Sequence, residues 1–188
     1  MLNLYFRLFK MKLITELDKN RLKKIQDLYN EAFPQAERKS FDLLLKTRDN
    51  GHAEILSVEN ENNDFLGLAI TAQYQDMVLL DYFAISPHLR SAGIGSKVFQ
   101  LLTQRYADRR FFLEIERADV TANNQLQRKK RKAFYLKNGM QNVPFTVNLC
   151  GIEMEILAYH CELSFHDYFD LYHSLFGERI SRHISLVK

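Results

Sequence analysis

The spacing of apolar residues divides the chain into amphipathic helices and short apolar strands. Helical spacing predicts helices over residues 20–33, 41–46, 94–107 and 125–137, and an aromatic-rich helix that ends before Gly177. Apolar runs bounded by polar turns predict strands over residues 53–58, 65–71, 77–86, 111–116, 140–147 and 152–159. The helix over 94–107 joins two apolar strands, and such a unit favours parallel neighbours with a right-handed connection. The order of elements therefore predicts an α/β fold with a mixed sheet flanked by helices.

Length and composition fit one folded domain. The chain has 188 residues, of which 46% are hydrophobic and 12% aromatic, with only 7 Gly and 3 Pro, so it is neither disordered nor of low complexity. No internal repeat or linker separates the aromatic tail from the rest. We therefore expect the tail to pack on the same domain.

Positive charge is concentrated in one segment. Lys and Arg number 26 and Asp and Glu 23, and five of the positive residues form the run 128–132. Without that run, 21 basic residues remain against the 23 acidic ones, so the basic surplus is local. The run could mark RNA binding or nuclear localisation, or it could be a solvated surface with one or two residues near a cofactor phosphate. We favour the second interpretation and expect no nucleic-acid partner.

Cysteine and histidine usage predicts neither disulfides nor a metal site. Cys150 and Cys161 belong to no disulfide or zinc spacing, and the histidines are widely spaced. No apolar run approaches the roughly 20 residues that a spanning helix needs, and the apolar start over 1–10 lacks a signal-peptide cleavage site. These features predict a cytoplasmic protein without a membrane partner.

A glycine turn lies between the end of a buried strand and the start of a helix. Arg90, Gly93 and Gly95 form the pattern Arg-x-x-Gly-x-Gly. Glycine permits a positive φ and a close approach to the main chain, and the first amides of a helix can bind an anion such as pyrophosphate. The pattern is not the dinucleotide fingerprint, because Val98 stands where its third glycine belongs, nor a P-loop. By itself it is compatible with a plain turn or with a phosphate cradle.

Two segments carry a family resemblance. Residues 82–96 resemble the acetyl-CoA-binding motif of the GNAT superfamily of N-acetyltransferases, and residues 131–140 resemble the helix of that family that ends in Phe-Tyr-x-x-x-Gly-Phe, with Met140 in the place of the last aromatic residue. The resemblance covers about residues 12–160. It implies a single domain whose two central parallel strands splay apart, and the aromatic-rich C-terminal helix lies outside the resemblance as an addition. We therefore expect an N-terminal extension over 1–10, an acetyltransferase domain over 11–160 and a helical tail over 161–188.

The resemblance also implies the residues that bind acetyl-CoA. Backbone amides at the end of the strand would hold the pantetheine and the thioester carbonyl, and the glycine turn would bind the pyrophosphate. The implied cofactor residues are Phe83, Ala84, Ile85, Arg90, Ser91, Ala92, Gly93, Ile94, Gly95 and Ser96. Arg128 stands where many members of the family carry an asparagine that touches the cofactor.

Three residues are candidates for catalysis. Tyr135 matches the family position near the cofactor sulfur, where its phenol could donate to the departing thiolate; alternatively it is a core residue. Glu114 lies on an apolar strand, where partial burial would raise the pKa of its carboxyl towards that of a useful base; alternatively it forms an ion pair with Arg117 or with the basic helix. Asp81 makes the same case from the neighbouring strand.

These observations predict an enzyme that transfers an acetyl group from acetyl-CoA to a primary amine of a small molecule or a protein by direct attack. A non-catalytic acyl-CoA-binding or regulatory module and an acetyltransferase of an RNA-associated protein are the alternatives. The aromatic tail is either a homodimer surface or a lid. The identity of the acceptor amine does not follow from the sequence.

Overall fold

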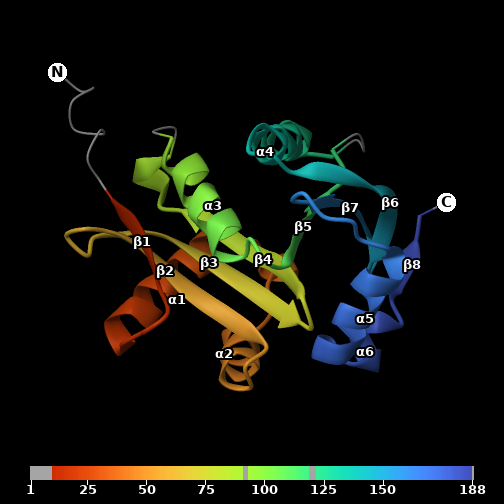
Figure 1. Cartoon of the computed structure of the whole chain (residues 1–188), viewed down its shortest axis with the longest axis horizontal. Helices are drawn as coiled ribbons and strands as arrows, with labels where there is room; N and C mark the ends of the chain where they lie inside the picture. Colours follow the sequence, from red (N-terminus) through yellow and green to blue (C-terminus); the bar gives the residue numbers. More distant parts are fainter. Residues whose placement is uncertain (1–9, 91–92, 119–121, 188) are drawn as a thin grey trace. The chain divides into compact units, whose positions relative to one another are not determined.

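The computed structural model describes residues 10–90, 93–118 and 122–187 (Figure 1). The N-terminal half contains β1 (Met11–Ile14), α1 (Lys19–Ala32), the short 3-10 helix η2 (Gln35–Glu37), α2 (Phe41–Asp49), β2 (Ala53–Asn60), β3 (Phe65–Tyr74), β4 (Met77–Ile85) and the 3-10 helix η3 (Pro87–Leu89). The C-terminal half contains α3 (Ile94–Arg105), β5 (Arg110–Glu116), α4 (Gln125–Lys137), β6 (Gln141–Leu149), β7 (Ile152–Ala158), α5 (Phe165–Phe176), α6 (Glu178–Ser181) and β8 (Ile184–Leu186).

The strands form one mixed sheet in the order β1-β2-β3-β4-β5-β7-β6-β8. β4 and β5 are parallel and are joined through α3, whereas β7 pairs antiparallel with both β5 and β6. The parallel register pairs Met77–Leu80 of β4 with Arg110–Leu113 of β5, and β4 continues beyond it to Ile85. The predicted fold class, a mixed α/β sheet with splayed central parallel strands and an extra C-terminal helix, is confirmed.

The chain divides into two compact units. The first contains the residues up to Ile70 and Tyr82–Leu102, and the second contains Thr71–Asp81 and Thr103–Lys188. In the first unit, Ile25 and Tyr29 of α1 and Leu44 of α2 pack on apolar residues of β2, β3 and β4. This packing fixes the carboxyl end of β4. The boundaries expected at residues 10 and 160 remain a prediction.

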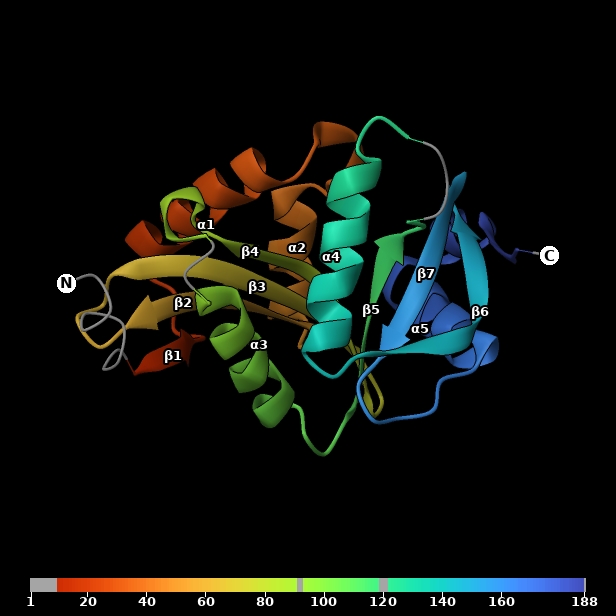
Figure 2. The ribbon, with the colours of Figure 1, turned by 90° about the horizontal axis from the view of Figure 1, so that it is seen from above.

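The core of the second unit includes the C-terminal helix. Tyr168, Leu171 and Tyr172 of α5 are almost completely buried against residues of β4, β5, β6 and β7. Helices α4 and α5 lie on opposite faces of this part of the sheet (Figures 1 and 2). The tail also contributes the strand β8, which pairs with β6 and which the sequence did not predict.

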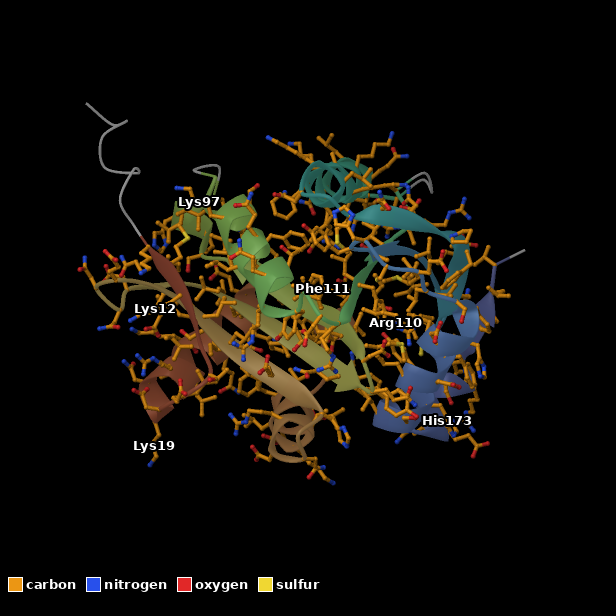
Figure 3. The ribbon with its side chains drawn as sticks, viewed as in Figure 1. Lys12, Lys19, Lys97, Arg110, Phe111 and His173 are labelled. Atoms are coloured by element: carbon orange, nitrogen blue, oxygen red, sulfur yellow. The ribbon has the colours of Figure 1, made fainter. Side chains whose placement is uncertain are left out.

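Two charged contacts fix the start of α5. Ser164 and Asp167 form a capping box, in which each side chain accepts the backbone N–H of the other residue. Arg110, at the start of β5 (Figure 3), lies 3.0 Å from Asp167. Burial acts to raise the pKa of Asp167, but hydrogen bonds from Ser164 and Arg110 outweigh it and lower the pKa to about 2.

Replacing Asp167 with Asn should lower the free energy of unfolding by about 1–2 kcal/mol at pH 7, since it removes the ion pair with Arg110 and the negative charge from the first turn of α5. Because the folded-state pKa is depressed, this stabilisation is complete above the ordinary value near 4 and is lost as the pH falls from about 4 to about 2. Urea unfolding at pH 7 and at successively lower pH values measures the difference.

The matched control is Asp170→Asn on the same helix, because Asp170 is exposed and pairs only at 3.3 Å with exposed His166. We expect little change in stability for this variant. An Asp167→Asn deficit that stays constant down to pH 2 would contradict the assignment of the stabilisation to the ionised carboxylate.

Candidate active site

One candidate feature, in the first unit, is the turn that precedes α3. Gly93 has a φ of +77°, and among the described residues no heavy atom beyond Gly93 and its chain neighbours lies within 4 Å of the position that a Cβ would take there. At the start of α3, where Figure 3 labels Lys97, the Lys97 N–H donates to the Gly93 carbonyl at 3.3 Å. The amides of Ile94, Gly95 and Ser96 therefore have no acceptor within the helix. The open space at the Gly93 Cβ position lets an anion come close to the start of α3, so the turn fits a phosphate cradle.

Arg90 connects this turn to the end of β4. Its Nε donates to the Ile85 carbonyl at 3.1 Å, and the residue is otherwise exposed. A guanidinium has further N–H donors that can bind phosphate oxygens. The predicted cofactor residues Ser91 and Ala92 lie outside the described residues, so their predicted role is not tested here.

The end of β4 depends on a glycine that sequence reasoning missed. A Cβ at Gly67 of β3 would lie 2.4 Å from the Ala84 carbonyl oxygen and 3.2 Å from the Ile85 Cα. Only glycine permits this approach of the two strands, which sets the backbone of Ala84 and Ile85. An isolated glycine inside an apolar strand is the signal that could have identified it. Phe83, Ala84 and Ile85 are thus held on a fixed backbone, with Phe83 packed 6.2 Å from Phe99 of α3.

The side of β4 away from the turn anchors the loop between α1 and α2. The Tyr82 hydroxyl accepts the Lys39 N–H at 3.0 Å and donates to the Glu37 carbonyl at 3.1 Å. The Tyr29 hydroxyl donates to the Lys39 carbonyl at 2.9 Å. Two buried tyrosines therefore hold the loop in place through its backbone.

A separate candidate feature, in the second unit, is the carboxylate of Glu114 on β5. The Tyr168 hydroxyl donates to Glu114 Oε2 and the Tyr172 hydroxyl donates to Glu114 Oε1, both at 2.6 Å. Asp81 and Glu114 follow directly after Leu80 and Leu113, which are register partners of the parallel strands β4 and β5, so the two carboxylates stand at neighbouring strand positions. The structure therefore brings two of the three predicted catalytic residues together.

Tyr135, the third candidate, lies on α4. Its side chain is 9% exposed, and burial, partly offset by the charge of Arg131, raises the pKa of its phenol to about 12. Because α4 and α5 cover opposite faces, Tyr135 and the tyrosines that hold Glu114 come from opposite sides of the sheet (Figure 2). The phenol of Tyr135 keeps its proton over the whole neutral range.

The basic residues considered as ion-pair partners of Glu114 form ion pairs with Glu153, Glu116 and Glu155. Arg117 pairs with Glu153 at 2.8 Å. In the basic run, Arg128 and Arg131 pair with Glu116, and Lys132 pairs with Glu155 of β7 at 2.8 Å. Three of the five basic residues therefore stabilise the attachment of α4 to the sheet, and these three do not form a free basic surface.

Neither a metal-binding cluster nor a membrane-spanning helix occurs in the part of the chain that the structure describes. Within residues 10–90, 93–118 and 122–187, no group of three or more His, Cys, Asp and Glu side chains is arranged to hold a metal ion. Over the same ranges, no helix is both long enough and apolar enough to cross a membrane.

Comparison with known proteins agrees with this geometry. The model of the acetyltransferase (GNAT) family matches residues 22–140. The chain belongs to the GNAT acetyltransferase family. A comparison with curated proteins found no match.

Solved structures share the fold. A GNAT-family putative acetyltransferase from Bacteroides thetaiotaomicron has a TM-score of 0.73 and 20% identity, over 92% of this chain and 98% of that chain. Spermidine N-acetyltransferase from Vibrio cholerae, solved in complex with CoA and spermine, has a TM-score of 0.61 and 14% identity, over 79% of this chain and 94% of that chain. A GNAT-family putative acetyltransferase from Desulfovibrio desulfuricans has a TM-score of 0.60 and 15% identity, over 80% and 98% of the two chains.

Proposed function

We propose that this protein is an acetyl-CoA-dependent N-acetyltransferase that acts on a primary amine. The observation that carries the proposal is the turn before α3, where Gly93 has a positive φ and open space at its Cβ position beside the start of a helix. Arg90 adds a positive charge at the same turn. The carbonyl and amide groups of Phe83, Ala84 and Ile85 are proposed to align the pantetheine as an added strand.

The bound cofactor supplies an acetyl thioester, and the protein supplies the proton handling. We assign Glu114 as the group that takes the proton from the substrate ammonium, because it is a carboxylate held in a fixed orientation by two hydrogen bonds. Asp81 adds negative charge that attracts the cationic amine. The amine is proposed to arrive from the side of the sheet that α5 covers.

Tyr135 is assigned as the hydrogen-bond donor to the departing sulfur. The phenol of Tyr135 has a pKa of about 12, whereas an ordinary thiol has a pKa near 8.5, so the phenol does not transfer its proton to the thiolate. Tyr135 therefore stabilises the thiolate by donating a hydrogen bond while it keeps its proton. This donor acts from the α4 side, opposite to the base.

The Tyr135→Phe variant should lower kcat by about 10²-fold and leave the Kd for acetyl-CoA nearly unchanged, because it removes one donor to developing charge. Its pH profile below about pH 10 should keep the shape of the wild-type profile, since the phenol of Tyr135 does not titrate there. Steady-state kinetics and calorimetry provide the measurements.

The matched control is Tyr106→Phe, which also removes a buried hydroxyl, in this case one that lies 3.2 Å from the Thr71 hydroxyl. The control should keep kcat within about twofold. Wild-type kcat in a folded Tyr135→Phe variant would show that Tyr135 only packs in the core.

Calorimetric titration with acetyl-CoA, followed by an acetylation assay on a panel of primary amines, tests the function itself. Binding together with turnover supports it. Binding without turnover on any amine would favour the non-catalytic acyl-CoA-binding module, and the absence of binding would overturn the proposal.

A further inference from the structure

The C-terminal helix α5 binds the candidate base directly. Tyr168 and Tyr172 each donate one hydrogen bond of 2.6 Å to Glu114, one to each carboxylate oxygen. This length is typical of O–H···O⁻ bonds to an ionised carboxylate. A carboxylate that accepts at both oxygens is therefore fixed in orientation and stabilised in its charged form.

The two tyrosines are themselves rigid. They are four residues apart, which places them on one face of α5, and their ring centroids are 4.9 Å apart. Their exposed fractions are 0% and 1%. Burial, together with the negative charges of Glu114 and Asp81, raises the pKa of both phenols well above the ordinary value, so both remain donors.

The attachment of α5 to β5 sets the register of these contacts. Arg110 pairs with Asp167 at the start of α5, and Glu114 lies four residues after Arg110 on the same strand. Residues of even spacing point to one face of a strand, so Arg110 and Glu114 both meet α5. Three side-chain contacts between β5 and α5 therefore place the phenols opposite the carboxylate.

We propose that Tyr168 and Tyr172 are positioning residues that hold the Glu114 carboxylate in the orientation and charge state in which it takes a proton from the substrate ammonium. This inference rests on the proposed function. The proton moves from the ammonium nitrogen to a Glu114 oxygen, the amine becomes neutral, and the phenols keep their own protons. The C-terminal tail is thus a working part of the active site.

The test uses the full chain with Tyr168→Phe, Tyr172→Phe and the double variant, and with Tyr106→Phe as the control. We expect kcat/KM for the amine to fall about 10-fold in each single variant and about 100-fold in the double variant. The acidic limb of the kcat/KM profile should move to higher pH, because the carboxylate loses donors that stabilise it. The Kd for acetyl-CoA should stay within about twofold, and the control should change neither kcat/KM nor the profile.

A purely structural role predicts a different pattern. Tyr168→Phe and Tyr172→Phe would then lower the Tm as Tyr106→Phe does, while kcat/KM and the acidic limb stay at their wild-type values, and this result would overturn the inference. If the double variant does not fold, the single variants decide the question. Failure of the proposed function and failure of this inference give different results. A wild-type chain that acetylates none of the amines overturns the proposed function and this inference with it. Tyrosine variants as active as an active wild-type chain overturn only the inference.

Discussion

The Gly93→Glu variant should lose at least about 100-fold in affinity for acetyl-CoA and keep its fold. The added carboxylate would enter the open space above the first amides of α3 and repel the pyrophosphate from them. The backbone φ of +77° makes any side chain unfavourable there by about 1–2 kcal/mol, which a folded domain can tolerate. Calorimetric titration measures the affinity, and thermal unfolding measures the fold.

Gly51 provides a control for the Gly93→Glu variant, because the two glycines have nearly the same backbone φ. It has a φ of +78°, and no atom lies within 4 Å of its Cβ position, yet it belongs to the turn between α2 and β2. Gly51→Glu carries the same backbone strain and the same charge, so it should unfold at a similar temperature and bind acetyl-CoA as the wild type does. Equal binding by both variants would mean that the turn before α3 does not hold the cofactor phosphates.

Helices and strands could be predicted from the sequence where the periodic spacing of apolar residues extends over many positions. The helix over 125–137 has the predicted bounds, because its apolar spacing is followed by Asn138 and Gly139, which stop a helix. The strands β1 and β8 were missed. They contain four and three residues, too few to show a period, and they are strands because β2 and β6 offer them hydrogen bonds.

The position of the glycine turn could be predicted because the residues that form it are close together in the sequence. Glu114 could also be identified, because a carboxylate on an apolar strand needs a partner. The identity of that partner could not be derived from the sequence. Tyr168 and Tyr172 lie 54 and 58 residues further along the chain, and only the packing of α5 on β5 brings them to the carboxylate. The expected ion pair with Arg117 did not anticipate these phenols.

The ion pairs of the basic run 128–132 could not be predicted from the sequence either, because their partners lie on other elements. Glu116 and Glu155 come from β5 and β7, and their pairing with α4 depends on how the helix crosses the sheet. The sequence shows that this segment is positively charged, but only the tertiary structure shows that three of its residues attach α4 to the sheet.

The second large effect is expected at Glu114. The Glu114→Gln variant should lower kcat/KM for the amine by about 10²–10⁴-fold, because the amide cannot take the proton from the ammonium. The fall in kcat/KM at low pH that protonation of Glu114 causes should be absent from the pH profile of this variant. The amide nitrogen cannot accept a hydrogen bond, so one of the two phenols loses its acceptor, and the free energy of unfolding should fall by about 1–3 kcal/mol.

Glu155→Gln is the matched control for this loss. Glu155 lies on β7 opposite Ile115 of β5, and its carboxylate binds Lys132 at 2.8 Å, so its replacement also removes a partly buried polar contact. The control should lose stability but keep kcat/KM within about threefold. Wild-type kcat/KM in a folded Glu114→Gln variant would exclude Glu114 as the base, and Asp81→Asn, measured beside it, would then show whether the neighbouring carboxylate takes the proton instead.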